Sequence, residues 1–165
     1  MIITISRLER NIGKLVGSAR MKESKRKNRK PAWIGTIKDG GGLLTNHQDG
    51  ACSELVAAKI LQTYYEPRIN NFKGADLLTN IEVRSTKVSW FGVKLRDRDG
   101  DDRIVIAVRK VNSLEWRCLG WIKAKDGKKK KWLKDPGGRG VYAYFVPIDA
   151  LEPIETLPVV RTKEA

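Results

Sequence analysis

The sequence predicts a protein of the mixed α/β (α+β) class, with a central sheet flanked by helices. Two helix-like segments come first in the chain, and about five to six strand-like segments follow them. Grouping of this kind is typical of an α+β arrangement. The strongest strand signal is Ile104–Val108, an uninterrupted apolar run of mostly β-branched residues, which indicates a central strand buried on both faces.

The length and charge of the chain limit its organisation and its partners. At 165 residues we expect one domain, made of an N-terminal helix and basic linker (1–45) and a core (46–165). Hydrophobic residues make up 41% and charged residues 32%, which favours a soluble globular chain. The net charge of +14 indicates a polyanionic partner, with nucleic acid ahead of an anionic membrane surface.

Neither a membrane nor a secretory pattern is evident in the sequence. No apolar run approaches the length of a membrane span, and residues 1–7 lack the pattern of a signal peptide. Cys52 and Cys118 are too far apart in sequence to form a metal-binding pair. We therefore expect a reduced, cytoplasmic setting and no membrane partner.

The first helix is predicted over residues 6–20, where apolar residues recur at spacings of three, four and seven. Gly13 and Gly17 weaken this prediction. The basic stretch that follows ends at Pro31, and it is either a solvated linker or a flexible arm that wraps a nucleic-acid backbone. The candidate arm residues are Lys25, Arg26, Lys27, Arg29 and Lys30.

A second helix is predicted from Gly50 to about Tyr65, with Asp49 as its N-cap. Apolar residues wrap most of its circumference, so we expect it to be buried. Glu54 falls in the apolar sector, and a buried carboxylate must be ion-paired, metal-bound or protonated. The alternative is a Glu54 side chain that reaches solvent near the positive helix N-terminus. His47 is interpreted as an incidental loop residue.

A hairpin with two acidic residues is predicted next. A three-residue loop, Leu78–Asn80, would pair Leu77 with Ile81 and place Asp76 opposite Glu82. Asn80 suits a left-handed conformation, whereas a two-residue loop would put the acids on opposite faces.

Alternation along the following strand puts Glu82, Arg84 and Thr86 on one face. Two carboxylates and a cation would then converge, as a divalent-metal phosphoryl-transfer site requires. A purely structural hairpin, with Arg84 paired to Glu82 or Asp76, is the alternative.

The remaining segments are assigned by alternation and turn residues. A lead-in strand is expected at 68–72, a solvent-exposed turn at 96–103 and a short helical turn at 149–151. Further strands are predicted at Val88–Arg96, Trp116–Ile122 and Val141–Val146.

Three short motifs resemble the PD-(D/E)xK nuclease superfamily, particularly its phage-type and Holliday-junction-resolvase-like members. Gly50–Ala58 matches the pattern Gly-Ala-x-x-Glu-x-x-x-Ala, with Glu54 as its acid. Gly74–Asp76 matches Gly-x-Asp, and Glu82–Arg84 matches Glu-x-Lys except for its last residue. The resemblance covers residues 50–86 closely, and later segments fit only in order.

The resemblance implies a restriction-endonuclease-like core and a metal-dependent deoxyribonuclease that acts in recombination, repair or phage DNA processing. Asp76 and Glu82 would bind Mg²⁺ (or Mn²⁺), the Val83 carbonyl would be a third ligand, and Glu54 would bind directly or through water. The setting would be the cytoplasm of a prokaryote or a phage-infected host. DNA is expected in preference to RNA, and cutting of both strands would favour a homodimer.

Arg84 departs from the superfamily pattern, because arginine cannot lose its proton and so cannot act as a general base. Lys87 lies nearby but alternates to the other face unless a bulge intervenes. The set Glu54, Asp76, Glu82 and Arg84 is therefore the predicted catalytic group, with two alternatives. The fold either binds nucleic acid without cutting it, or it is a basic structural or assembly protein.

Basic and aromatic residues interleave near the end of the chain. Lysines neutralise phosphates and tryptophans stack on bases, so this stretch is a candidate nucleic-acid clamp. Trp132 is alternatively a loop anchor, and Trp121 is expected in the core. With Lys87, the predicted contacts are Lys128, Lys129, Lys130, Lys131, Trp132 and Lys134.

Overall fold

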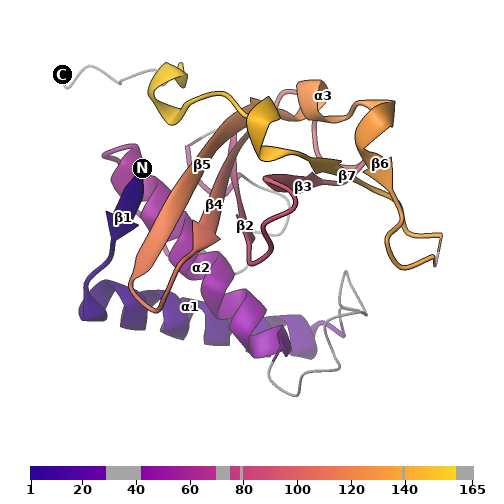
Figure 1. Cartoon of the computed structure of the whole chain (residues 1–165). Helices are drawn as coiled ribbons and strands as arrows, with labels where there is room; N and C mark the ends of the chain where they lie inside the picture. The colour runs from indigo at the N-terminus through magenta and orange to yellow at the C-terminus, as the bar shows by residue number, and fades with distance from the viewer. Residues whose placement is uncertain (29–41, 70–74, 79, 139, 159–165) are drawn as a thin grey trace.

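A computed structural model describes residues 1–28, 42–69, 75–78, 80–138 and 140–158. Its longer elements confirm the mixed class, with helices first and strands after them (Figure 1). The helices and strands are β1 (Ile2–Thr4), α1 (Arg7–Arg26), α2 (Gly42–Ile60), β2 (Ile81–Thr86), β3 (Val93–Leu95), β4 (Ile104–Lys110), β5 (Glu115–Lys123), α3 (Ala124–Gly127), β6 (Leu133–Lys134) and β7 (Ala143–Val146). Short 3₁₀ turns are η2 (Lys130–Trp132), η3 (Ile148–Ala150) and η4 (Ile154–Thr156).

The described strands form two sheets instead of one sheet of five to six strands. The larger sheet has the order β1-β5-β4-β2, and it is mixed because β2 runs parallel to β4. The smaller sheet, in the order β3-β7-β6, is antiparallel. The predicted strands at 88–96 and 141–146 therefore exist in shortened form, but they pair with each other and not with the central strands.

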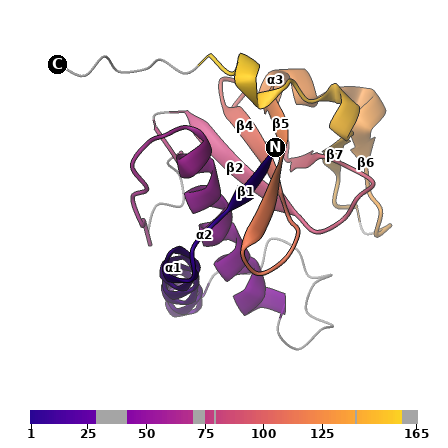
Figure 2. The same cartoon turned by 60° about the vertical axis from the view of Figure 1, so that its left-hand side comes forward.

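The larger sheet is covered on both faces, as Figure 1 shows. Alternate residues Ile104, Ile106 and Val108 of β4 pack with α2, whereas Val105 and Ala107 pack against the smaller sheet. This double burial explains why β4 is apolar without alternation. Seen in the turned view, α1 lies beside α2, and α2 contacts the sheet (Figure 2).

The first helix is longer than predicted and packs tightly on the second. A capping box between Ser6 and Glu9 starts α1, which continues to Arg26. A Cβ atom on Gly17 would lie 2.4 Å from the Gln48 Cα atom, and one on Gly13 would lie 2.5 Å from the Cys52 sulfur. The glycines that weaken the helix prediction are therefore the points where α2 approaches α1 most closely.

The predicted start of the second helix is wrong. Helix α2 begins at Gly42 and ends at Ile60, so His47 is helical and Asp49 is an interior residue and not an N-cap. The Asp49 carboxylate forms ion pairs with Lys110 (2.7 Å) and Lys87 (3.0 Å). Packing against α1 stabilises the additional turns, whose polar sequence alone gives no strong helix signal.

Other features complete the fold. Strand β1, which the sequence pattern did not predict, pairs with β5 at the edge of the larger sheet. Residues 68 and 69 form no strand, and the rest of the predicted lead-in strand lies outside the described residues. In the part of the chain that is described, no helix is long and apolar enough to cross a membrane.

Candidate functional site

The acidic hairpin has the predicted pairing. Leu77 pairs with Ile81, and the Asp76 backbone N–H donates to the Ile81 carbonyl at 2.9 Å. The left-handed residue is Leu78 (φ 50°) and not Asn80. The Val83 N–H donates to Asp76 Oδ2 at 2.7 Å, which fixes the carboxylate beside the strand edge that β4 does not occupy. The Val83 carbonyl faces this edge too, since both polar groups of a strand residue point to one side.

Glu82 and Glu54 lie on opposite sides of the larger sheet. Glu82 and Arg84 are level with Val105 and Ala107, the residues of β4 that face the smaller sheet. Glu54 belongs to α2, which covers the other face. Asp76 lies at the open edge of β2. The charges of Asp76 and Glu82 both raise the pKa of Glu54, so the three carboxylates are within electrostatic range of one another.

Glu54 is buried and ion-paired, which is one of the alternatives that its sequence position left open. Its exposed fraction is 5%, and Arg20 of α1 contacts both of its oxygens, with Nη2 to Oε2 at 2.7 Å. Arg20 also donates through Nε to the Arg68 carbonyl at 2.7 Å. The sequence motifs do not reveal Arg20, because nothing in the sequence links it to a residue so far along the chain.

The site acids share a raised affinity for protons. Burial raises the pKa of Glu54 to about 7, against the opposing hydrogen bond from Arg20, and the Asp76 charge raises it further. Burial also raises the pKa of Asp76, although the Val83 N–H and Arg84 oppose it. For Glu82, burial and then Asp76 raise the pKa, while Arg84 lowers it. Repulsion among these carboxylates favours a cation near the pair Asp76 and Glu82.

The residues fit a two-carboxylate metal site better than the expected three-carboxylate one. Among the described residues, no group of three or more His, Cys, Asp or Glu side chains is arranged to hold a metal ion. Mg²⁺ needs only one or two carboxylates when waters and substrate phosphates complete its shell. Asp76, Glu82 and the Val83 carbonyl could supply those protein oxygens, whereas Glu54 is already ion-paired with Arg20.

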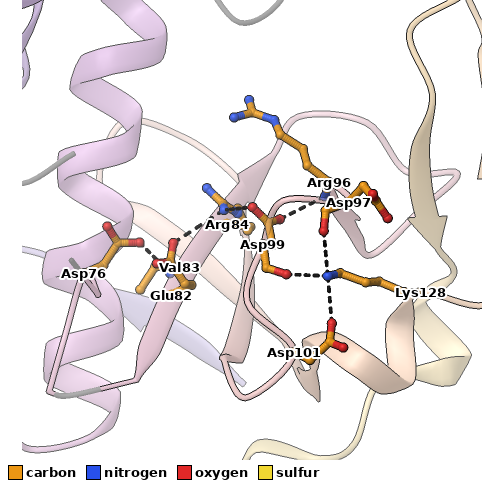
Figure 3. Close-up of polar contacts among 9 residues, drawn as sticks. All are labelled: Asp76, Glu82, Val83, Arg84, Arg96, Asp97, Asp99, Asp101 and Lys128. Atoms are coloured by element: carbon orange, nitrogen blue, oxygen red, sulfur yellow. Dashed lines mark hydrogen bonds and ion pairs between the residues drawn. The ribbon is translucent and has the colours of Figure 1, made fainter. Parts of the chain in front are cut away.

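Arg84 is held by two acids (Figure 3). Its Nη2 lies 3.4 Å from Glu82 Oε2 and 3.1 Å from Asp99 Oδ1. The other Asp99 oxygen accepts the Arg96 N–H at 2.9 Å. The pairing of Arg84 with Glu82 that the structural-hairpin alternative expected is therefore present. Asp99, from the turn at 96–103, is a second partner that the sequence motifs did not reveal.

Lys128 fixes the same turn and is not a freely exposed clamp residue. Its Nζ donates to the Asp97 carbonyl and to Asp101 Oδ1, both at 2.8 Å, and to the Asp99 carbonyl (Figure 3). The side chain is only 13% exposed. Lys128, which follows α3, thus ties this part of the chain to the turn at 96–103, whose Asp99 contacts Arg84.

The other predicted nucleic-acid contacts are scattered. Arg26 and Lys27 pair with Glu23, Lys25 is exposed at the end of α1, and Lys87 pairs with Asp49. Arg29 and Lys30 lie outside the described residues. Exposed lysines 129, 130, 131 and 134 gather near the smaller sheet.

Trp132 packs against the core of the smaller sheet, with Lys129 and Lys131 at 5.2 and 5.0 Å from its ring, as a loop anchor would. Trp121 is in the core, as predicted.

Lys94 is a basic residue near the site that the motif analysis missed. It lies on β3, which contacts β2, and burial lowers its pKa, as do the charges of Arg96 and Arg84. The alternation Val93-Lys94-Leu95 was a usable signal, because it places a lone lysine on the face opposite two apolar residues.

Comparisons of the chain with protein-family models, with curated proteins and with solved structures find no match. The resemblance to the PD-(D/E)xK nucleases therefore rests on the residues and their arrangement alone.

Proposed function

We propose that the protein is a metal-dependent deoxyribonuclease that processes DNA in a prokaryotic or phage-infected cytoplasm, in recombination, repair or phage DNA processing. The observation that carries the proposal is the grouping of Asp76, Glu82 and the Val83 carbonyl at the open edge of β2. A bound Mg²⁺ or Mn²⁺ would supply Lewis acidity and an activated water for phosphodiester hydrolysis.

The neighbouring cations suit a phosphate substrate. Arg84 lies on the same face as Glu82, and Lys94 and Arg96 are close enough to it for their charges to interact. Such cations orient a phosphate and offset negative charge that develops during its displacement. Arg84 does this without exchanging a proton, because its guanidinium stays charged.

Purified protein incubated with labelled linear, nicked and branched DNA, in Mg²⁺ or Mn²⁺, tests the proposal. We expect cleavage that Asp76→Asn and Glu82→Gln each reduce at least 100-fold, a typical loss when one strong charge interaction is removed from such a site. Asp126→Asn is the matched control, because Asp126 is an exposed acid on α3. Calorimetric titration with Mn²⁺ should show binding that both site variants weaken. Cleavage at the wild-type rate by both Asp76→Asn and Glu82→Gln would exclude this site.

A second function, nucleic-acid binding without cleavage, is favoured by a different observation. Arg84 is already paired with Glu82 and Asp99, and Glu54 with Arg20. In that case DNA binding would be salt-sensitive and no cutting would occur in either metal. Absence of both binding and cutting would leave the basic structural or assembly protein as the remaining reading.

A further inference from the structure

The connection from β2 to β3 carries an exposed tryptophan that belongs to a rigid aromatic group. The Trp90 ring stacks on Phe145 of β7, with centroids 5.0 Å apart and planes 26° apart. Phe91 packs edge-on against both rings at 4.6 and 5.1 Å. Phe145 is only 7% exposed, so Trp90 rests on a buried base. We call Trp90, Phe91 and Phe145 the Trp90 platform.

The platform leaves much of Trp90 open to solvent. Trp90 is 54% exposed although one ring face is covered by Phe145. Covering the exposed face of an indole is favourable, and aromatic rings contribute strongly to binding energy at interfaces. Because neighbouring rings already fix its orientation, little side-chain entropy is lost when a ligand stacks on it.

The charge around the platform identifies the kind of ligand. Lys134 Nζ lies 5.9 Å from the Trp90 ring centroid. Residues 129–134 contain four exposed lysines and no acid. An aromatic face beside a row of cations matches a strand of nucleotides, whose bases stack while its phosphates pair with the lysines.

The platform is connected to the candidate site through the smaller sheet. Lys94 of β3 is level with Phe145 of β7, and Lys134 of β6 is level with Ala143, so these side chains share one sheet face. Strand β3 contacts β2, which carries Glu82 and Arg84 (Figure 1). A strand that stacks on Trp90 can therefore continue toward the acidic edge of β2.

We propose that the Trp90 platform stacks on unpaired bases of a single nucleic-acid strand and thereby directs that strand toward the acidic site. This inference rests on the nucleic-acid-binding part of the proposed function and not on cleavage. It gives the protein a preference for unpaired nucleotides, since bases inside a duplex present no free face to a tryptophan.

Fluorescence anisotropy in EDTA tests the platform without any cleavage. Trp90→Ala should weaken binding of a labelled oligothymidylate about tenfold, and Trp90→Phe should recover most of the loss. On an abasic strand of equal length, Trp90→Ala should bind like the wild type, because only phosphates remain to be contacted. Equal losses on both strands, or no loss on either, would overturn the proposal.

Two further variants separate stacking from charge. Lys134→Gln should weaken binding of the thymidylate and abasic strands alike, and Lys14→Gln, an exposed lysine of α1, should change neither. A blunt duplex should be insensitive to Trp90→Ala, and a loss equal to that on the single strand contradicts base stacking. Binding that depends on Trp90, without any cleavage, would disprove the nuclease proposal and support the Trp90 platform. Cleavage and binding that are both unaffected by Trp90→Ala would support the nuclease proposal and disprove the platform.

Discussion

At the scale of single residues, the pairing of Glu54 with Arg20 is the main departure from the motif. A buried carboxylate is costly unless it is paired, and a forked guanidinium is the partner that satisfies both of its oxygens. The side chains are 7% and 18% exposed. The ion pair with Arg20 therefore explains the acidic residue at position 54 without a metal. The proposed metal site rests on Asp76 and Glu82.

Arg20→Met should destabilise the protein, and more strongly at pH 8 than at pH 5. The variant leaves the Glu54 carboxylate buried without its cation, a change that typically costs about 3–5 kcal/mol. The folded-state pKa of Glu54, about 7, lies above the ordinary value of 4.5. Stability from this raised pKa is complete below about 4.5 and lost as the pH rises through about 7. Urea denaturation at each pH, in EDTA, measures the effect.

The control for this prediction is the exposed pair of Arg26 with Glu23. Arg26→Met should leave the free energy of unfolding nearly unchanged at both pH values, because solvent screens that pair. Adding Glu54→Gln to Arg20→Met should remove most of the pH dependence. If Arg20→Met cost the same at pH 5 and pH 8, the Glu54 charge would not be the cause.

At the scale of elements, the contact between α1 and α2 determines where the ion pair of Glu54 and Arg20 can form. Glycines spaced four apart lie on one face of α1, so two backbones can approach there. Their effect on helix propensity and their effect on packing have opposite signs. The sequence pattern reports the first effect, and only the packed structure reveals the second.

Gly17→Ala should destabilise the protein by about 1–3 kcal/mol even though alanine favours a helix. The added methyl group would meet the backbone of Gln48, which has no flexible end to move. Gly50→Ala in α2 is the matched control, because no atom lies within 4 Å of its Cβ position. It should stabilise the protein by up to about 1 kcal/mol. Thermal and urea denaturation compare the two variants, and stabilisation by both would contradict the close approach of the helices.

At the scale of the whole molecule, the net charge of +14 favours a polyanionic partner, and several of the predicted contact residues are already engaged within the protein. Arg26 and Lys27 are engaged by Glu23, and Lys128 by the turn at 96–103. Exposed lysines near the smaller sheet remain available for phosphate contacts. Lysines 129, 130, 131 and 134 are therefore candidate contacts for a polyanion.

Binding of DNA should weaken steeply as salt rises, because each phosphate contact releases counterions. The slope of log K against log salt should fall by about 0.7 on a single strand when Lys129→Gln removes one contact. Lys128→Gln should leave the slope closer to the wild-type value, since that side chain is bound to the turn. Anisotropy titrations across a salt series measure both, and identical slope changes would contradict the assigned roles.

The sequence determined the mixed class, the central strand, the buried character of α2 and the pairing of Leu77 with Ile81, because these depend on local periodicity and turn chemistry. It also predicted that Asp76 and Glu82 lie near each other, because the hairpin that joins them is short. It failed where distant segments meet. Arg20 lies 34 residues from Glu54, and Asp99 lies 15 residues from Arg84.

Only the tertiary structure decided which acids remain available for a metal and which are already paired. Strands β3 and β7 formed a second sheet because their apolar faces pack on Val105 and Ala107, the far side of β4. Packing of that layer brings Lys94 of β3 within electrostatic range of Arg84 on β2. Local pattern specifies which face of an element is apolar, but the element that covers this face is chosen by packing of the whole chain.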